Sequence, residues 1–133
     1  MFQKLAVLIL PLLILICGCG SDNPVDQPPM GQYFTVQVAA EQFTMLVTDP
    51  ATIQLALDNL NGKNQMHPNG RIMTGNGGFN HLWNWHFVPD SVRMVEVSVE
   101  VCDGLPSYVN SHINDFMAVG YCPWSAKIIK AGL

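Results

Sequence analysis

Apolar and polar residues alternate in several short stretches of the chain, and this pattern is typical of strands with one buried face. The first two stretches cover residues 33–38 and 42–48, which are close enough to pair as a hairpin around Ala40 and Glu41. Residues 71–73 predict a third, short strand between two loops rich in glycine and asparagine.

The clearest alternation lies in two neighbouring stretches, residues 83–87 and 92–103. The first alternates Trp83, Trp85 and Phe87 with polar residues, and the second alternates four valines with polar residues and a cysteine. If these strands pair directly, their odd-numbered residues must share the core face, because a slip of one residue would place the tryptophans beside the carboxylates. The polar positions of the even-numbered face are then Asn84, His86, Glu96, Ser98 and Glu100.

Two helices are predicted by apolar residues that recur with a period near 3.6. In the first, Asp49 is the expected N-cap, Pro50 occupies the first turn, and Gly62 supplies the stop. Its apolar stripe is Ile53, Ala56, Leu57 and Leu60. The second helix covers residues 106–118, and residues 125–130 predict a last edge strand whose lysines discourage pairing with other chains.

At 133 residues the chain has room for one compact domain and no second core. We assign residues 33–133 to a single α+β domain, with an antiparallel sheet of about five strands, two packing helices and one disulfide. The disulfide is expected between Cys102 and Cys122, because two cysteines remain in an exported chain and an oxidising compartment favours their pairing. A thiolate metal site would need more cysteines or a Cys-X-X-Cys spacing.

The N-terminus has the features of an export signal. Lys4 precedes an apolar run over residues 5–16, which is too short to span a bilayer comfortably. The residues that follow resemble a bacterial lipobox, so residues 1–18 are expected to be a signal peptide and Cys19 to carry the lipid. A plain signal peptide cleaved near Gly20 is the alternative.

Residues 19–32 contain three prolines and few apolar residues, so they predict a flexible tether. Two or more acyl chains on Cys19 would anchor the domain to the membrane durably. Gly20, rather than aspartate, follows the lipidated cysteine, and in bacterial lipoproteins this resembles an outer-membrane rather than an inner-membrane address. We therefore expect an exported protein on the outer membrane or cell surface.

The charge balance excludes one class of partner. The chain has six basic and ten acidic residues, and removing Lys4 with the signal leaves five against ten. Without a basic patch there is nothing to hold a nucleic-acid backbone, so nucleic acid is excluded as a partner. No cofactor is expected.

The best candidate for chemistry is the even-numbered strand face. His86 could bind a divalent metal or act as a base, with Glu96 or Glu100 beside it. The alternative is a polar sheet face whose histidine is solvated or hydrogen-bonded to a covering loop. Asp103 follows at a turn. The aromatic residues could line a groove for sugar or peptide, namely Trp83, Trp85, Trp124, Tyr33, Tyr108 and Tyr121. Because the alternation places Trp83 and Trp85 in the core, Trp124 is the tryptophan expected to be partly exposed.

Four motifs stand out along the chain: Asp49-Pro50 before a helix ending at Gly62, Trp83-X-Trp85-His86 with Pro89, Glu100 to Pro106, and Cys122-Pro123-Trp124-Ser125. Together they resemble the N-terminal domain of the cyclic-AMP-inducible prespore proteins of social amoebae, a small secreted domain of unknown function. The resemblance implies secretion, a disulfide and one fold, but no reaction. It also places His86, Glu100, Asp103 and Trp124 at motif positions.

The leading expectation is a lipid-anchored envelope domain that binds an unidentified ligand or protein partner. One alternative is a metal-dependent or acid/base enzyme that uses His86 with Glu96 or Glu100. The other is a structural or inhibitory surface module that acts through loops such as residues 75–80 and 121–124.

The lipid anchor can be tested by substituting Cys19→Ser. The variant should leave the membrane fraction, because it has no thiol to acylate, whereas Cys17→Ser should leave the protein in the membrane fraction. Immunoblots of separated membrane and soluble fractions measure the difference. Continued membrane retention of the Cys19→Ser protein would contradict the anchor.

Overall fold

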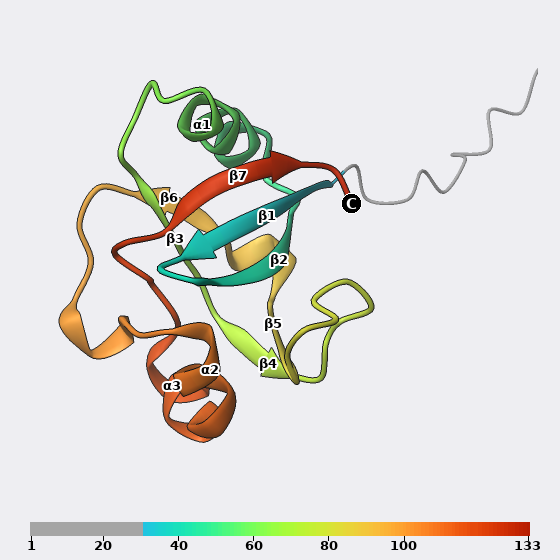
Figure 1. Cartoon of the computed structure of the whole chain (residues 1–133), viewed down its shortest axis with the longest axis vertical. Helices are drawn as coiled ribbons and strands as arrows, with labels where there is room; N and C mark the ends of the chain where they lie inside the picture. The colour runs from blue at the N-terminus through green and yellow to red at the C-terminus, as the bar shows by residue number, and fades with distance from the viewer. Residues whose placement is uncertain (1–30) are drawn as a thin grey trace, which may run out of the picture.

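The computed structural model describes residues 31–133 (Figure 1). The expected signal peptide, the lipidated Cys19 and nearly all of the expected tether lie outside the described residues. Within residues 31–133, no helix has the length and apolar character needed to cross a membrane.

The described chain contains three α-helices, seven strands and two short 3₁₀ helices, all within one mixed α and β domain. In chain order they are β1 (Gln32–Val38), β2 (Glu41–Val47), α1 (Pro50–Leu60), β3 (His67–Asn69), β4 (Ile72–Thr74), β5 (Trp85–Phe87), η1 (Pro89–Ser91), β6 (Arg93–Val95), η2 (Glu100–Cys102), α2 (Pro106–Ser111), α3 (Ile113–Val119) and β7 (Lys127–Ala131).

The first two strands form the predicted hairpin. β1 and β2 pair antiparallel, with Val36 opposite Phe43, and the turn lies at Ala39 and Ala40 rather than one residue later. Ala39 has a φ of 54°, which such a tight turn requires. Alternate residues of both strands are buried, so the hairpin presents one apolar face to the core.

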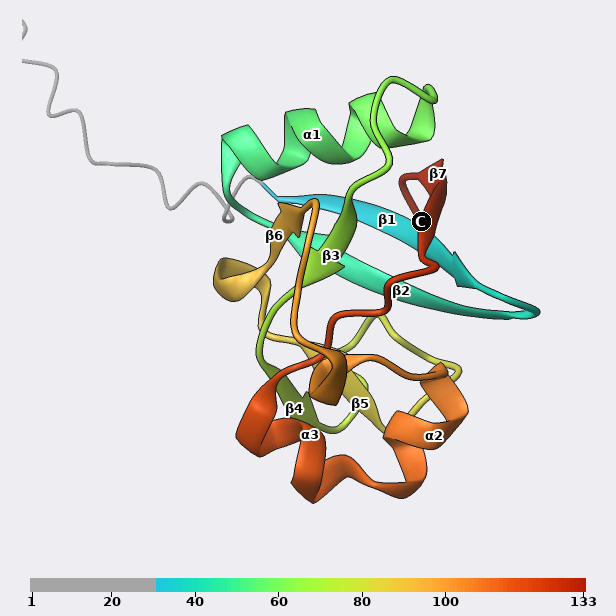
Figure 2. The same cartoon turned by 90° about the vertical axis from the view of Figure 1, so that its left-hand side faces the viewer.

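β7 joins the other side of β1 and gives the order β2-β1-β7, which confirms the predicted C-terminal edge strand. Figure 1 shows these strands side by side in the front of the molecule. In Figure 2, α1 lies at one end of the domain, and α2 and α3 lie at the opposite end beside β4 and β5.

The predicted start of α1 is confirmed. The Asp49 carboxylate accepts hydrogen bonds from the Thr52 backbone N–H at 2.9 Å and from the Thr52 hydroxyl at 2.7 Å. These bonds lower the pKa of Asp49, since they favour its charged form. Ala56 is fully buried, and the other three residues of the predicted stripe pack against the core.

The prediction of one five-stranded sheet is wrong, because the strands divide among three small antiparallel sheets. β5 pairs with β4, which places Phe87 opposite Ile72. β6 pairs with β3, which places Val95 opposite His67. The direct pairing expected between residues 83–87 and 92–103 therefore does not occur.

The long strand expected over residues 92–103 ends at Val95. Of the four alternating valines, Val97, Val99 and Val101 are 84%, 65% and 64% exposed, so the odd-numbered core face stops there. The predicted core role is confirmed for Trp85 and Phe87, which are fully buried. The strand is short because its partner β3 has only three residues, and the pairing ends where Val95 lies opposite His67.

The predicted second helix is interrupted. His112 has φ −126° and ψ 33°, and it separates α2 from α3. The Ser111 hydroxyl and His112 Nδ1 both lie 3.0 Å from the Tyr108 carbonyl oxygen, and the His112 ring stacks on Tyr108 at 4.0 Å. Side chains that compete for helical carbonyls in this way favour a local break.

Tyr121 lies at the centre of the core. Its ring is fully buried, with Phe43, Trp85, Phe87 and Phe116 around it at centroid distances of 5.2 to 5.8 Å. Its hydroxyl donates to the Gly104 carbonyl at 2.9 Å. Burial raises the pKa of this hydroxyl, so it remains a neutral donor.

The predicted disulfide joins Cys102 in η2 to Cys122, with their Cα atoms 5.1 Å apart. The Cys122 backbone N–H also donates to the Cys102 carbonyl at 2.8 Å. The bridge closes a loop with a sequence separation of 20. Loop closure of that size is worth about 3 kcal/mol of stability.

Asn80 completes the outer edge of β2. Its Oδ1 accepts from the Thr44 backbone N–H at 3.0 Å, and its Nδ2 donates to the Trp85 carbonyl at 2.7 Å. Nearby, the Trp83 indole N–H donates to the Gln42 carbonyl at 2.8 Å. Asn80 is completely buried, so its amide links β2 to β5 where no ladder of backbone hydrogen bonds connects them.

Substituting Asn80→Ala should lower the free energy of unfolding by about 2 to 4 kcal/mol, because it leaves the Thr44 N–H and the Trp85 carbonyl without hydrogen-bond partners. Urea unfolding followed by tryptophan fluorescence measures this loss. The matched control is Asn114→Ala on the exposed side of α3, which should change stability by less than about 0.5 kcal/mol. Equal stability of the two variants would contradict the bridging role.

Candidate functional site

His86 lies on β5 beneath the glycine-rich loop that follows β4. Its Nδ1 is 2.7 Å from the Gly75 carbonyl oxygen, and Phe79 approaches the ring edge-on at a centroid distance of 5.7 Å. Gly77 has a φ of 63°, and a Cβ there would lie 2.7 Å from the imidazole. His86 thus anchors a covering loop, which is the alternative that the sequence left open.

Glu96 and Glu100 lie in the segment that links β6 to α2, and not on a strand beside β5. The expected contact between His86 and Glu96 required direct pairing of their strands, and that pairing is absent. Among residues 31–133, no three His, Cys, Asp or Glu side chains are placed so that they could share a metal ion.

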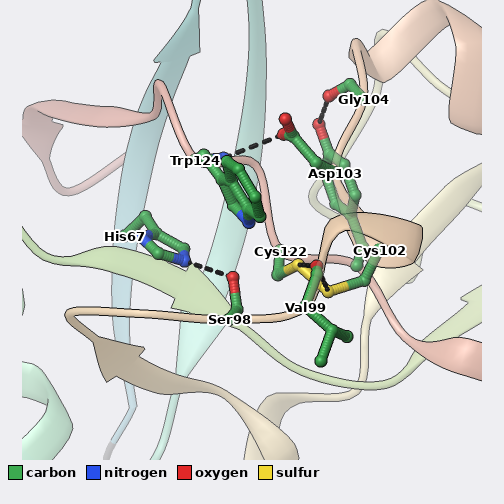
Figure 3. Close-up of a disulfide and its surroundings, with 9 residues drawn as sticks. His67, Ser98, Val99, Cys102, Asp103, Gly104, Cys122 and Trp124 are labelled. Atoms are coloured by element: carbon green, nitrogen blue, oxygen red, sulfur yellow. Dashed lines mark hydrogen bonds between the residues drawn. A yellow bond between two sulfur atoms is a disulfide. The ribbon is translucent and has the colours of Figure 1, made fainter.

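Trp124 lies two residues beyond the disulfide and is 47% exposed, as its sequence context predicted. Its backbone N–H donates to Oδ1 of Asp103 at 2.9 Å. Because Asp103 follows Cys102 and Trp124 follows Pro123, the covalent bridge and this hydrogen bond hold the same two segments together. Figure 3 shows the Trp124 indole projecting beside the disulfide. These contacts therefore hold the backbone of Trp124 in place.

His67 is the site residue that the sequence did not reveal. It is only 4% exposed, and its Nε2 lies 2.7 Å from the Ser98 hydroxyl (Figure 3). Burial lowers its pKa, and the nearby charge of Asp103 offsets this only in part. The imidazole is therefore neutral at neutral pH, with one nitrogen as donor and the other as acceptor.

The position of His67 depends on the pairing of β3 with β6, two strands of three residues each. Strands this short carry no measurable periodicity, so the sequence offered only a loop histidine. Glu96 and Ser98 were expected on one polar face, and they do line one hollow, but with His67 in place of His86.

Two hollows flank Trp124. One has a volume of about 200 Å³, and its walls include His67, Glu96 and Ser98. The other has a volume of about 340 Å³, and its walls include Lys127. Both are lined by Gln65 and Trp124, so they adjoin. We name the pair the Trp124 groove, defined by Gln65, His67, Glu96, Ser98, Trp124 and Lys127.

The wall of the larger hollow is held by side-chain amides. Asn59 Nδ2 donates to the Met66 carbonyl at 2.9 Å, and Asn59 Oδ1 accepts from the Ile128 backbone N–H at 3.0 Å. Asn64 Nδ2 donates to the Leu55 carbonyl at 3.0 Å. These bonds fix the loop after α1 against β7, so the groove is formed before any ligand arrives.

The contact between His67 and Ser98 can be compared with that of a nucleophilic serine and its base. A serine nucleophile needs a histidine whose second nitrogen is oriented by a third group. Within the described residues, Nδ1 of His67 has no hydrogen-bond partner, although no side-chain nitrogen or oxygen is both fully buried and unpaired. That nitrogen is therefore not completely shielded from solvent, although His67 as a whole is only 4% exposed.

Residues 30–132 match the family model described as the BP-74 N-terminal domain. The chain belongs to the BP-74 N-terminal domain family. The match confirms the resemblance drawn from the four sequence motifs, and it covers every strand and helix of the described domain. Neither the curated proteins nor the solved structures contain a match to the chain.

The buried His67 predicts acid sensitivity in this BP-74 N-terminal domain. Its folded-state pKa lies below the ordinary value of 6.5, so the unfolded chain binds a proton that the folded chain does not. Stability should therefore be complete above pH 6.5 and decline as the pH falls below it. Protonation of Asp49 should reduce stability only at lower pH, because its folded-state pKa lies below its ordinary value of 3.8.

Thermal unfolding between pH 7 and pH 5 measures this effect. His67→Gln should flatten the decline, because the variant has no imidazole to protonate. The control, His81→Gln, changes an exposed loop histidine and should preserve the decline. Parallel pH profiles for wild type and His67→Gln would show that another group causes the decline.

Proposed function

We propose that this protein is a lipid-anchored envelope protein whose single domain binds a ligand in the Trp124 groove. The lipobox-like sequence ending at Cys19 supports the anchor, and the proline-rich residues 19–32 support a spacer between membrane and domain. The disulfide fits an oxidising compartment outside the cytoplasm.

The observation that carries the binding function is the rigid exposure of Trp124 between two hollows. A large aromatic side chain left 47% exposed forgoes much of its hydrophobic stabilisation. The backbone that carries it is nevertheless held in place by the disulfide and by the bond to Asp103. An aromatic side chain that stays exposed on an ordered backbone is a common feature of ligand-binding sites, because little ordering is needed when the ligand binds.

The two alternative functions have less support. An enzyme that uses His86 with Glu96 or Glu100 would need these groups together, and their strands lie in different sheets. A surface module that acts through residues 75–80 or 121–124 would need free loops, whereas Phe79 and Asn80 of the first loop are buried. In the second loop residues 121–123 are buried, and the exposed Trp124 belongs to the groove. Binding in the groove accounts for the exposure of Trp124, and it needs neither a contact between His86 and a glutamate nor a free loop.

Proton–nitrogen NMR of the indole groups tests groove binding directly. The Trp83 and Trp85 indole N–H groups donate to the carbonyls of Gln42 and Pro106, which makes them internal references. A screen of small polyols, aromatic acids and amines against the Cys19→Ser protein should shift the Trp124 indole resonance selectively. The shift should disappear in Trp124→Ala and persist in Leu82→Ala, which alters an exposed apolar residue of another loop.

Compounds that shift the Trp83 or Trp85 resonances and leave Trp124 unchanged would place the site elsewhere. If no compound shifts the Trp124 resonance in a screen of small compounds and of neutral oligomers, the binding function of the groove is contradicted.

A further inference from the structure

The aromatic group of the groove is a flat platform with a polar border. Trp124 presents part of its indole to solvent, while Ser98 and Gln65 lie on the surrounding walls. A ligand that fits such a surface needs one apolar face and a rim of hydrogen-bonding groups. A pyranose ring has this shape, with C–H bonds on its face and hydroxyls around its edge.

The rim groups each combine donor and acceptor capacity. The Gln65 amide, the Ser98 hydroxyl and the neutral His67 imidazole can all donate and accept. His67 is only 4% exposed and its Nε2 lies 2.7 Å from the Ser98 hydroxyl, so it orients that hydroxyl from below, whereas the Gln65 side chain is exposed. Hydroxyl groups are also both donors and acceptors, so the Gln65 amide and the Ser98 hydroxyl can each bond a sugar hydroxyl whichever way its proton points.

The charges of the groove favour a neutral ligand. Glu96 borders the smaller hollow and Lys127 borders the larger one. Neither side chain forms an ion pair within residues 31–133. A ligand with one sign of charge that spans both hollows would be attracted at one end and repelled at the other.

An extended peptide fits less well, because strand addition needs free backbone groups at a sheet edge. β7 is the edge strand that borders the larger hollow. There the Ile128 N–H already donates to Asn59 Oδ1 at 3.0 Å. A peptide would have to displace this internal bond in order to pair with β7.

We propose that the Trp124 groove binds a neutral oligosaccharide of at least two rings, one of them stacked on the Trp124 indole. Two adjoining hollows of about 200 and 340 Å³ on either side of one tryptophan account for the minimum of two rings. This assignment rests on the proposed binding function and specifies its ligand class.

An array of immobilised neutral glycans, probed with the Cys19→Ser protein, identifies the bound glycan class. Titration of the best soluble representative against the labelled protein should then shift the Trp124 indole resonance. Trp124→Ala should weaken binding about tenfold or more, which corresponds to about 1.4 kcal/mol. Trp124→Phe should restore most of the affinity, since it keeps an aromatic face. Leu82→Ala is the matched control and should bind as wild type does.

Three comparison probes separate the ligand classes: a galacturonic acid trimer as anion, a glucosamine trimer as cation, and tetra-alanine as peptide. Tighter binding of any of these than of every neutral glycan would overturn the assignment. If small compounds shift Trp124 but no neutral glycan binds, the saccharide assignment fails and the binding function stands. If neither small compounds nor glycans reach Trp124, both fail.

Discussion

The Cys102–Cys122 disulfide joins two segments that no sheet holds together. One segment runs from the end of β6 through η2, and the other leads from α3 into β7. The first supplies Glu96 and Ser98 to the groove, and the second supplies Trp124. Without the covalent bond, the two walls would be connected by the packing of Tyr121 and by three hydrogen bonds, which the Cys122 N–H, the Trp124 N–H and the Tyr121 hydroxyl donate. The geometry of the candidate site therefore depends on one cross-link.

Side chains take the place of backbone ladders elsewhere in the domain. Asn80 connects the edge of β2 to β5. Glu41, at the start of β2, accepts from the Ser107 backbone N–H at 2.8 Å and from its hydroxyl at 2.6 Å, and so caps α2, which has no capping side chain of its own. These polar links allow three small sheets to share one core without a continuous sheet.

The parts of the fold that the sequence predicted are those encoded by neighbouring residues. The β1–β2 hairpin follows from period-two alternation, and α1 follows from its cap and its apolar stripe. The disulfide follows from counting cysteines in an exported chain. The pairings of β3 with β6 and β4 with β5 were missed, because three-residue strands leave too little pattern to show which partner they choose. The same limit explains why the candidate site was missed, since the contact of His67 with Ser98 spans 31 residues. His86 was predicted as the site because residues 83–87 and 92–103 were expected to pair directly, and η1 separates β5 from β6.

The pairing of β1 with β7 joins the two ends of the described chain in one sheet. Thr35 pairs with Lys130, and the Gly132 N–H donates to the Tyr33 carbonyl at 2.8 Å, so the first and last strands of the domain meet (Figure 1). Synthesis proceeds from the N-terminus, and β7 is the last of the seven strands to be made. The three-stranded sheet can therefore close only after β7 has left the ribosome. A growing chain that lacks β7 stays incompletely folded, with one side of β1 unpaired.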